Sequence, residues 1–311
     1  MTIPIKSIAI ASRSFSKHPI LRNEVLKRYP DATFNDKGLT LKGDSLIEFL
    51  QGHEMAITAL EVIDESILSR LPDLKVIGKY GVGLDMLDLN AMKIRGVKLG
   101  WSGGINKRSV SELVVSFAIN LLHRASFASS EVKKGKWYQV KGRQLSNCTI
   151  GIVGCGHIGK DLVNLLKPFN CKIIVHDILD FKDFYIDHNI KPVGLEELLI
   201  QSDVITLHLP LDDSTKNIIN SERLQLIKPD AVLINLARGG LIDETALKQM
   251  LVNKKLAGAA LDVFEVEPPK NQDFSLMDNV IVTPHIGGST EEAILAMGMA
   301  AINSLDSATE T

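Results

Sequence analysis

Residues 148–159 read CTIGIVGCGHIG, an apolar run that ends in the pattern Gly154-x-Gly156-x-x-Gly159. In this pattern the first glycine permits a tight strand-to-helix turn, the second lets the backbone approach a pyrophosphate, and the third lets the helix pack closely on the strand. An acidic residue, Asp177, ends the next apolar run and follows Gly154 by 177 − 154 = 23 positions. A carboxylate that binds a ribose is expected at a spacing of roughly 20. The segment therefore predicts a strand–turn–helix unit that binds a dinucleotide, with its phosphates at the helix N-terminus.

Strand-like runs alternate with helical patterns along almost the whole chain. This alternation is typical of α/β proteins with parallel sheets. The dinucleotide pattern begins near residue 149, and a separate α/β pattern precedes it. A long apolar helix predicted over 107–124 lies at the junction, and its apolar positions cover more than one face. Such a helix is buried, either inside the chain or against a second subunit. Asp243 and Thr290 are expected to cap the helices that follow them.

Composition excludes several classes of protein. Among 311 residues, 35 Lys and Arg balance 37 Asp and Glu, a net charge of −2 that argues against a nucleic-acid binder. No apolar stretch approaches the roughly 18–20 residues of a membrane span, and the N-terminus shows no signal-peptide layout. The three cysteines, Cys148, Cys155 and Cys171, lack metal-ligand spacing. We expect buried thiols in a reducing compartment, the cytoplasm, with neither a disulfide nor a metal site.

Three segments beyond the glycine pattern carry candidate chemistry. Arg238 follows a hydrophobic strand pattern, and its planar fork suits a carboxylate. Asp262 and Glu267 follow a second such pattern, and His285 ends a third, just before a Gly-Gly pair. Open α/β sheets bind their ligands at the carboxyl ends of strands. Taken singly, Arg238 could lie in a surface turn, the two acids could belong to a solvated charge cluster, and His285 could be a structural residue. Together they supply what hydride reduction of a carbonyl requires: a cation to hold the substrate, a proton donor, and a carboxylate to orient that donor.

At these residues the chain resembles the D-isomer-specific 2-hydroxyacid dehydrogenases, most closely their D-3-phosphoglycerate dehydrogenase-like branch. The resemblance covers most of the chain and is strongest over residues 74–289. The matching segments, in order, are LKVIGKYGVGLD, NKRSVSE, the glycine pattern, HLP, NLARG, DVFEVEP and PHIGG. It implies an α/β fold of two Rossmann-like, doubly wound parallel-sheet domains. A flavodoxin-like substrate domain would comprise residues 1–101 and 287–311, and an NAD-binding domain residues 102–286.

The resemblance also implies roles for individual residues. His285 is the general acid/base, Glu267 hydrogen-bonds it, and Arg238 anchors the substrate carboxylate and carbonyl. Asp177 binds the adenosine ribose of NAD. The remaining cofactor-binding residues are Gly154, Gly156, His157, Ile158, Gly159, His208, Leu209, Pro210, Leu236, Ala237, Arg238, Asp262, His285, Gly287 and Gly288. Val82 and Gly83 would offer backbone N–H groups to the substrate carboxylate, and Asn106 would face the substrate cleft.

Two features bear on the substrate. Both features depart from the best-known phosphoglycerate dehydrogenases. The segment Ala59-Leu60-Glu61, after a predicted strand, has no arginine that could bind a phosphate. In addition, no C-terminal regulatory domain is expected after the last helix. Arg13, after the first strand, is a candidate cation for a phosphate or second carboxylate on the substrate. A solvent-exposed turn is the alternative interpretation of that segment.

The sequence thus predicts an NAD-dependent dehydrogenase of D-2-hydroxyacids, or 2-oxoacid reductase, with a small 2-hydroxy or 2-oxo acid as its partner. A hydroxypyruvate or glyoxylate reductase and a D-3-phosphoglycerate dehydrogenase are the alternatives within this class. An NAD-sensing binding protein similar to the C-terminal-binding corepressors is the alternative from another class, because a shared fold does not fix function. The family commonly dimerises through the nucleotide domain, so a homodimer is expected, with no nucleic-acid or membrane partner.

Overall fold

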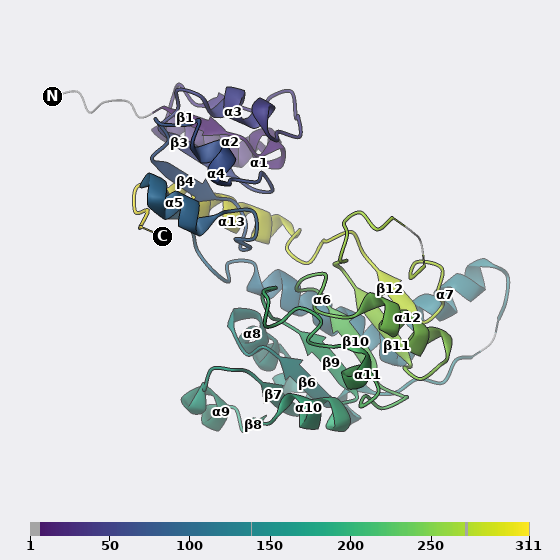
Figure 1. Ribbon diagram of the computed structural model, residues 1–311. Helices are drawn as coiled ribbons and strands as arrows, with labels where there is room; N and C mark the ends of the chain where they lie inside the picture. Colours follow the sequence, from purple (N-terminus) through teal and green to yellow (C-terminus); the bar gives the residue numbers. More distant parts are fainter. Residues whose placement is uncertain (1–6, 138, 271–272, 311) are drawn as a thin grey trace. The chain divides into compact units, whose positions relative to one another are not determined.

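The computed structural model describes residues 7–137, 139–270 and 273–310, which fold into two compact units (Figure 1). The first unit takes its residues from Met1–Asn106 and Glu291–Thr311, and the second from Lys107–Thr290. The sequence placed the domain boundaries after residues 101 and 286, and these boundaries stay a prediction. None of the helices formed by the described residues is long and apolar enough to cross a membrane.

The first unit is built on a five-stranded parallel sheet of order β2-β1-β3-β4-β5. This is the flavodoxin-like order expected for the substrate domain. Its strands are β1 (Ile8–Ile10), β2 (Thr33–Phe34), β3 (Met55–Thr58), β4 (Val76–Lys79) and β5 (Lys98–Gly100). Buried side chains form one apolar cluster with α1 (Arg13–Lys17), α2 (Pro19–Arg28) and α13 (Glu291–Ser304), and another with α3 (Asp44–Leu50), α4 (Glu65–Leu68) and α5 (Leu89–Arg95).

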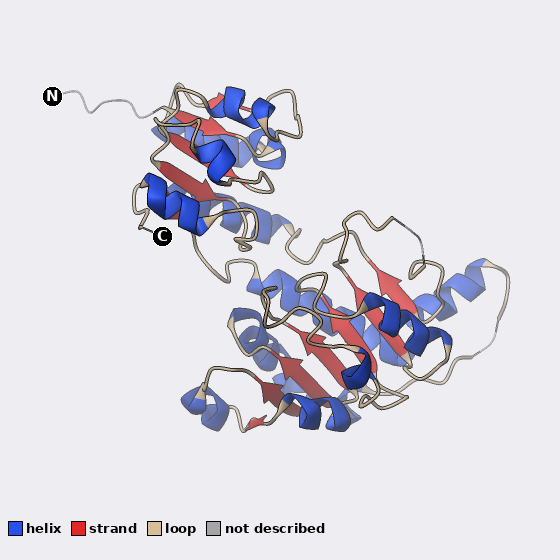
Figure 2. Cartoon of the chain, in the orientation of Figure 1, coloured by secondary structure: helices blue, strands red, loops and turns tan. Residues whose placement is uncertain are grey.

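The second unit contains a seven-stranded parallel sheet of order β12-β11-β10-β9-β6-β7-β8, seen with its helices in Figure 2. Its strands are β6 (Thr149–Val153), β7 (Lys172–His176), β8 (Lys191–Pro192), β9 (Val204–Leu207), β10 (Val232–Asn235), β11 (Gly258–Leu261) and β12 (Val280–Val282). The strand order reverses at the β6–β9 pair, where a doubly wound sheet opens a crevice for ligands. Both sheets confirm the predicted fold class.

Helices cover both faces of this second sheet. One apolar cluster includes side chains of α10 (Leu195–Gln201), α11 (Ser221–Leu224) and α12 (Glu244–Val252). The other includes α6 (Lys107–His123), α8 (His157–Leu166) and α9 (Lys182–Asp187). α7 (Ala125–Lys133) follows α6, and the short 3-10 helices are η1 (Leu145–Asn147) and η2 (Lys167–Phe169). Because both faces are covered, the strands are almost continuously apolar, as buried parallel strands are.

The structure confirms the long predicted helix and one predicted cap. α6 spans Lys107–His123, and the Asp243 carboxylate accepts a hydrogen bond from the Ala246 backbone N–H at the start of α12. The sequence did not predict α1, α7 or α9, nor the two-residue strands β2 and β8. A strand of two residues is too short to show an alternating pattern, which is why β2 and β8 could not be predicted.

Candidate active site

Six neighbouring strands of the second sheet end beside predicted site residues. Because all strands are parallel, their carboxyl ends meet at one edge of the sheet. That edge is where an open α/β sheet binds its ligands. The residues that follow strands β6, β7, β9, β10, β11 and β12 are, respectively, Gly154, Asp177, His208, Leu236, Asp262 and, three positions past its strand, His285.

The glycine pattern has the local geometry that its sequence implies. Gly154 has φ +97°, a conformation that favours glycine, and a Cβ atom there would overlap the carbonyl oxygen of His208. A Cβ atom at Gly159 would overlap the carbonyl oxygen of Gly154, so α8 packs closely on the turn. At Gly156 a Cβ atom would meet only open space. Side chains therefore leave room beside the second glycine, as a pyrophosphate requires.

The N-terminus of α8 is open to an anion. Gly156 is its N-cap and provides no side-chain hydrogen bond to the first turn, which His157 and Ile158 begin. Uncapped N–H groups and the helix dipole attract a phosphate. Asp177 is half-buried beside this turn: its Oδ2 accepts from the Cys155 N–H at 2.6 Å and its Oδ1 from the Leu179 N–H at 2.8 Å. The donors and the carboxylate both fit a dinucleotide with a free ribose diol.

His208 contributes a neutral ring to the same edge. Its Nε2 lies 3.0 Å from the Thr206 hydroxyl oxygen, and its buried Nδ1 has no hydrogen-bond partner among the described residues. Burial lowers the pKa of His208 to about 3, because the charged imidazolium loses its hydration. The ring therefore adds no positive charge near physiological pH. Leu209 is half-buried beside it and Pro210 is exposed.

The turn that carries Arg238 is organised by a buried asparagine. The Asn235 side chain is 2% exposed. Its Nδ2 donates to the Arg238 carbonyl oxygen at 2.8 Å and its Oδ1 accepts from the Ala237 N–H at 3.1 Å. The half-buried Arg238 also donates from Nη1 to the Ala237 carbonyl oxygen at 2.7 Å. Asn235 thus fixes the backbone from which the guanidinium extends. Asn235 begins the NLARG motif, and nothing in the sequence alone assigns it this role.

His285 and Glu267 form a hydrogen-bonded pair. Nδ1 of His285 lies 2.8 Å from Oε2 of Glu267, and the other carboxylate oxygen accepts from the Phe264 N–H at 3.1 Å. The two side chains are 50% and 37% exposed. An ionised carboxylate only accepts hydrogen bonds, so Nδ1 carries the ring proton and Nε2 remains for proton exchange. This is the arrangement of a general acid/base and its orienting group.

Asp262 holds the backbone around His285. This residue is 1% exposed, and its carboxylate accepts from the Thr283 hydroxyl at 2.6 Å and from the N–H groups of Ile286 and Gly287 at 2.7 Å each. Its carbonyl oxygen accepts from the His285 N–H, and His285 has φ +55°. These contacts fix a histidine in a conformation that non-glycine residues seldom adopt. That Asp262 meets a nicotinamide stays a prediction.

A serine from α6 completes this support. The Ser109 hydroxyl donates to the Gly287 carbonyl oxygen at 2.6 Å, so Gly287 is held from both sides. Ser109 could not be predicted as a site residue, because its partner lies 178 positions away in the sequence. α6 carries several other polar residues, so Ser109 has no distinguishing signal in the sequence.

The remaining predicted residues belong to the first unit. Val82 and Gly83 follow β4 and are half-buried, and the Trp101 indole N–H donates to the Val82 carbonyl oxygen at 3.1 Å. Arg13 begins α1, is exposed, and donates from Nη1 to the Thr40 hydroxyl at 3.3 Å. Asn106 is 8% exposed, and its buried Oδ1 has no hydrogen-bond partner in the described part of the chain. That these residues meet the substrate beside Arg238 stays a prediction.

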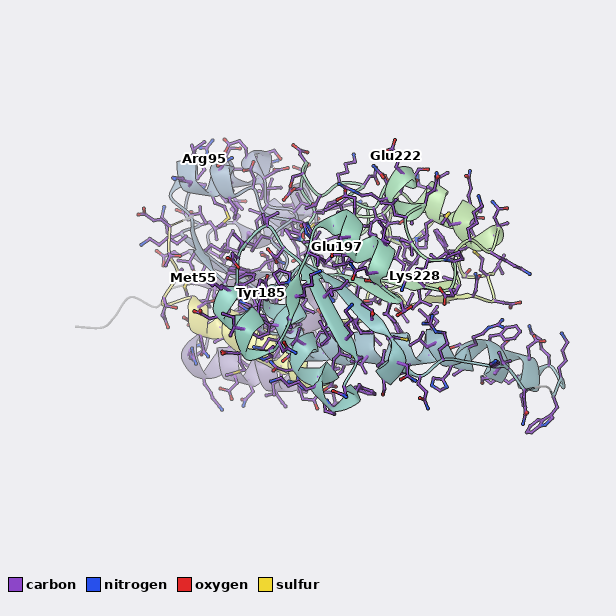
Figure 3. The ribbon with its side chains drawn as sticks, turned by 90° about the horizontal axis from the view of Figure 1, so that it is seen from below. Met55, Arg95, Tyr185, Glu197, Glu222 and Lys228 are labelled. Carbon is purple, nitrogen blue, oxygen red and sulfur yellow. The ribbon has the colours of Figure 1, made fainter. Side chains whose placement is uncertain are left out.

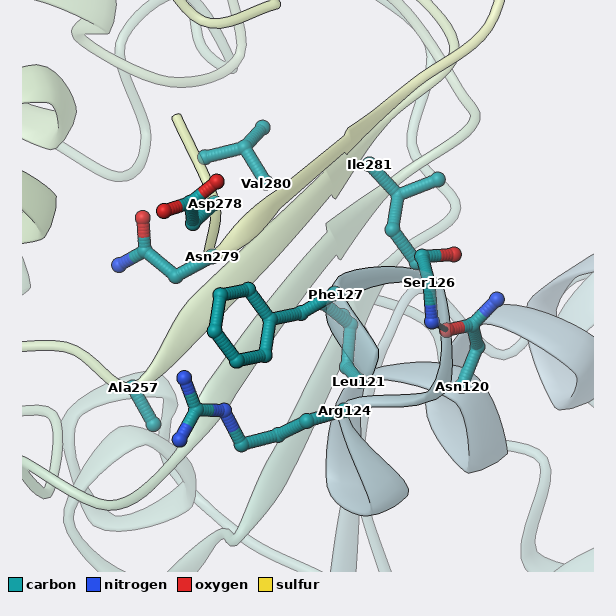
Figure 4. A pocket seen from close by; sticks show the side chains of 10 residues that line it. All are labelled: Asn120, Leu121, Arg124, Ser126, Phe127, Ala257, Asp278, Asn279, Val280 and Ile281. Atoms are coloured by element: carbon teal, nitrogen blue, oxygen red, sulfur yellow. Dashed lines mark hydrogen bonds between the residues drawn. The ribbon is translucent and has the colours of Figure 1, made fainter. Parts of the chain in front are cut away.

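A small pocket of the second unit is separate from these residues. Figure 4 shows it between the α6–α7 junction and the start of β12. The Arg124 guanidinium carbon lies 4.6 Å from the centre of the Phe127 ring on its wall. Its lining is Asn120, Leu121, Arg124, Ser126, Phe127, Ala257, Asp278, Asn279, Val280 and Ile281. It contains no predicted site residue.

The doubly wound sheet and the geometry of the glycine pattern together define a dinucleotide-binding protein. Residues 115–287 match the model of the D-isomer specific 2-hydroxyacid dehydrogenase, NAD binding domain. The chain belongs to the D-isomer specific 2-hydroxyacid dehydrogenase family, whose members are NAD-dependent oxidoreductases. The predicted family and the predicted cofactor, NAD, are confirmed.

Its relatives carry different substrate names. A D-3-phosphoglycerate dehydrogenase of Methanocaldococcus jannaschii is 37% identical over 84% of this chain and 50% of that protein. A hydroxypyruvate reductase of Thermotoga maritima is 35% identical over 83% of this chain and 86% of that protein. The crystal structure of a D-lactate dehydrogenase from Aquifex aeolicus with NAD and lactic acid has a TM-score of 0.84 and 26% identity, covering 97% and 94% of the two chains. The aligned part of this chain thus spans about half the length of the first relative.

Proposed function

We propose that the protein is an NAD-dependent D-2-hydroxyacid dehydrogenase that also runs as a 2-oxoacid reductase. The observation that carries this proposal is the His285–Glu267 pair, with its Nδ1–Oε2 distance of 2.8 Å, at the same sheet edge as the glycine pattern and Arg238. Family membership alone supports the reaction class, and the pair supplies a proton donor that a binding protein does not need.

Each residue has a chemical task in this reaction. Bound NAD supplies or accepts the hydride. Arg238 binds the substrate carboxylate, where its fork geometry matches the two oxygens. His285 gives the proton from Nε2 to the substrate oxygen during reduction and takes it back during oxidation. Glu267 holds the ring in this orientation and stabilises the protonated form by its charge.

The substrate's far end decides between phosphoglycerate and smaller acids. The absence of an arginine in Ala59-Leu60-Glu61 favours a hydroxypyruvate or glyoxylate reductase. Arg13 offers the contrary signal, because its exposed guanidinium lies at the carboxyl edge of the first sheet. However, the hydroxyl of neighbouring Ser16 is buried and donates to the Ile10 carbonyl oxygen, so it offers nothing to a ligand. We propose a small 2-oxoacid, with phosphohydroxypyruvate as the competing substrate.

Steady-state kinetics with NADH and a panel of 2-oxoacids test this proposal. Glyoxylate, hydroxypyruvate, pyruvate and phosphohydroxypyruvate sample neutral and anionic R groups. Turnover of at least one acid that disappears in His285→Ala supports a dehydrogenase. NADH binding without any turnover would instead favour an NAD-sensing binding protein. If the wild type prefers phosphohydroxypyruvate and Arg13→Ala loses this preference, Arg13 binds the phosphate of that substrate.

We also propose a homodimer formed through the second unit. Apolar side chains are exposed on and beside α7, where Val132 is 48% and Trp137 87% exposed. Burial of such surface stabilises an oligomer. Light scattering coupled to gel filtration gives the mass, and Trp137→Ser should shift the protein toward monomer. The cytoplasmic location stays a prediction that rests on free cysteines at positions 148, 155 and 171.

A further inference from the structure

Glu244, the first residue of α12, contacts the loop that carries Glu267. Its Oε1 accepts a hydrogen bond from the Glu265 N–H at 2.7 Å. Glu265 itself is exposed, and its side chain takes no part in this contact. The loop is therefore held at its backbone by a carboxylate from a helix 21 positions earlier in the sequence.

The peptide group held in this way contacts the Arg238 turn, and its residue Phe264 also contacts Glu267. The Phe264–Glu265 peptide packs so closely on Gly239, the neighbour of Arg238, that a Cβ atom there would overlap it. The N–H of Phe264, which belongs to the preceding peptide group, donates to Oε1 of Glu267, whose other oxygen binds His285. A shift of this peptide would carry Phe264 with it, and would therefore disturb the hydrogen bond to Glu267 and relax the contact with the Arg238 turn.

We propose that Glu244 is a positioning residue for the Glu267–His285 pair, acting through the Phe264–Glu265 peptide. The role in turnover rests on the proposed dehydrogenase function. Glu244 is half-buried, and three carboxylates gather here. Burial first, and then the charges of Glu265 and Glu267, raise the pKa of Glu244. A carboxylate at this half-buried place, beside two others, is unfavourable for folding. The hydrogen bond by which Glu244 holds the loop would explain why the residue is there.

Paired substitutions separate the hydrogen bond from the charge. Glu244→Gln keeps an acceptor oxygen, whereas Glu244→Ala removes it. Glu222→Ala is the matched control, because Glu222 also lies in the first turn of a helix, α11, and its side chain is at the surface (Figure 3). The control reproduces the loss of a first-turn carboxylate and leaves the catalytic loop untouched.

Two measurements on the full-length protein test whether Glu244 positions the Glu267–His285 pair. The first is the Nδ1–H proton resonance of His285 in histidine labelled with nitrogen-15, assigned by its absence in His285→Ala. A strong hydrogen bond to Glu267 shifts this proton downfield. The second is kcat and KM for a 2-oxoacid with NADH. The resonance reports on the pair whether or not the protein turns over a substrate.

We expect Glu244→Ala to lose the downfield resonance and to lower kcat about tenfold, the scale of one hydrogen bond to a charged group. The dissociation constant for NADH should not change, and Glu244→Gln and Glu222→Ala should keep both the resonance and kcat. A wild-type resonance in Glu244→Ala would overturn the inference, as would equal losses in Glu244→Ala and Glu244→Gln. Absence of turnover in the wild type would refute the proposed function, and the resonance would still decide the role of Glu244.

Discussion

Replacing Gly239 by alanine should damage catalysis by separating the Arg238 turn from the loop that carries Glu267. A Cβ atom on Gly239 would lie 2.5 Å from the backbone nitrogen of Glu265 and nearer still to the carbonyl oxygen of Phe264. Cβ atoms essentially never come within 3.0 Å of such atoms. The two segments must therefore move apart by at least ~0.5 Å at the nitrogen, and further at the oxygen, since carbon contacts are optimal beyond ~3.5 Å.

A displacement on the scale of ~1 Å at a reacting group can cost roughly 100-fold in rate, or ~2.7 kcal/mol of transition-state stabilisation. We expect kcat/KM for a 2-oxoacid to fall by about this factor in Gly239→Ala. NADH binding should change little, because the glycine pattern follows a different strand. Gly194→Ala is the control, since a Cβ atom there meets nothing within 4 Å. A folded Gly239→Ala protein with kcat/KM like that of the control would refute this reasoning.

Three further predictions concern the cofactor, the substrate and stability. Asp177→Ala should narrow a preference for NADH over NADPH, because the carboxylate repels a 2′-phosphate; equal kcat/KM ratios before and after the change would remove Asp177 from this role. Arg238→Lys should lower kcat and kcat/KM at unchanged folding stability, because lysine lacks the planar fork; kinetics like those of wild type would exclude Arg238 from the site. The depressed pKa of His208, about 3 against 6.5, means that the unfolded chain binds a proton there that the folded protein does not. Stability should therefore fall as pH drops below about 6.5, by up to ~3 kcal/mol at pH 4 from this group. Urea unfolding at pH 7 and pH 4 should show a smaller loss in His208→Asn, and an identical loss would contradict the burial argument.

Local sequence patterns predicted those site residues that directly follow the carboxyl ends of parallel strands. The strands that precede Gly154 and Asp262 can be recognised by their apolar runs, and a parallel sheet brings the carboxyl ends of such strands to one edge. The glycine pattern carries its own conformational requirements, and Gly154 and Gly159 meet them. Fold class and candidate site could therefore be predicted with little knowledge of packing.

Contacts between distant segments could not be predicted in this way. The bond from Ser109 to Gly287 spans 178 positions, and the bond from Glu265 to Glu244 joins a loop to a helix that looks like any other acidic helix start. In the sequence Asn235 is an ordinary polar residue at a strand end, and only the structure shows that its side chain donates a hydrogen bond to the Arg238 carbonyl oxygen. Their roles come from tertiary geometry, which no period in the sequence encodes.

The central claim is stereospecific hydride transfer to a 2-oxoacid with His285 as the proton donor. The most direct test is reduction of the best 2-oxoacid by NADH in which both C4 hydrogens are deuterium, followed by chiral chromatography and mass spectrometry of the product. We expect the D-2-hydroxyacid with one deuterium at C2, and almost no product from His285→Ala. An L or racemic product, a product without deuterium, or unchanged formation by His285→Ala would contradict it.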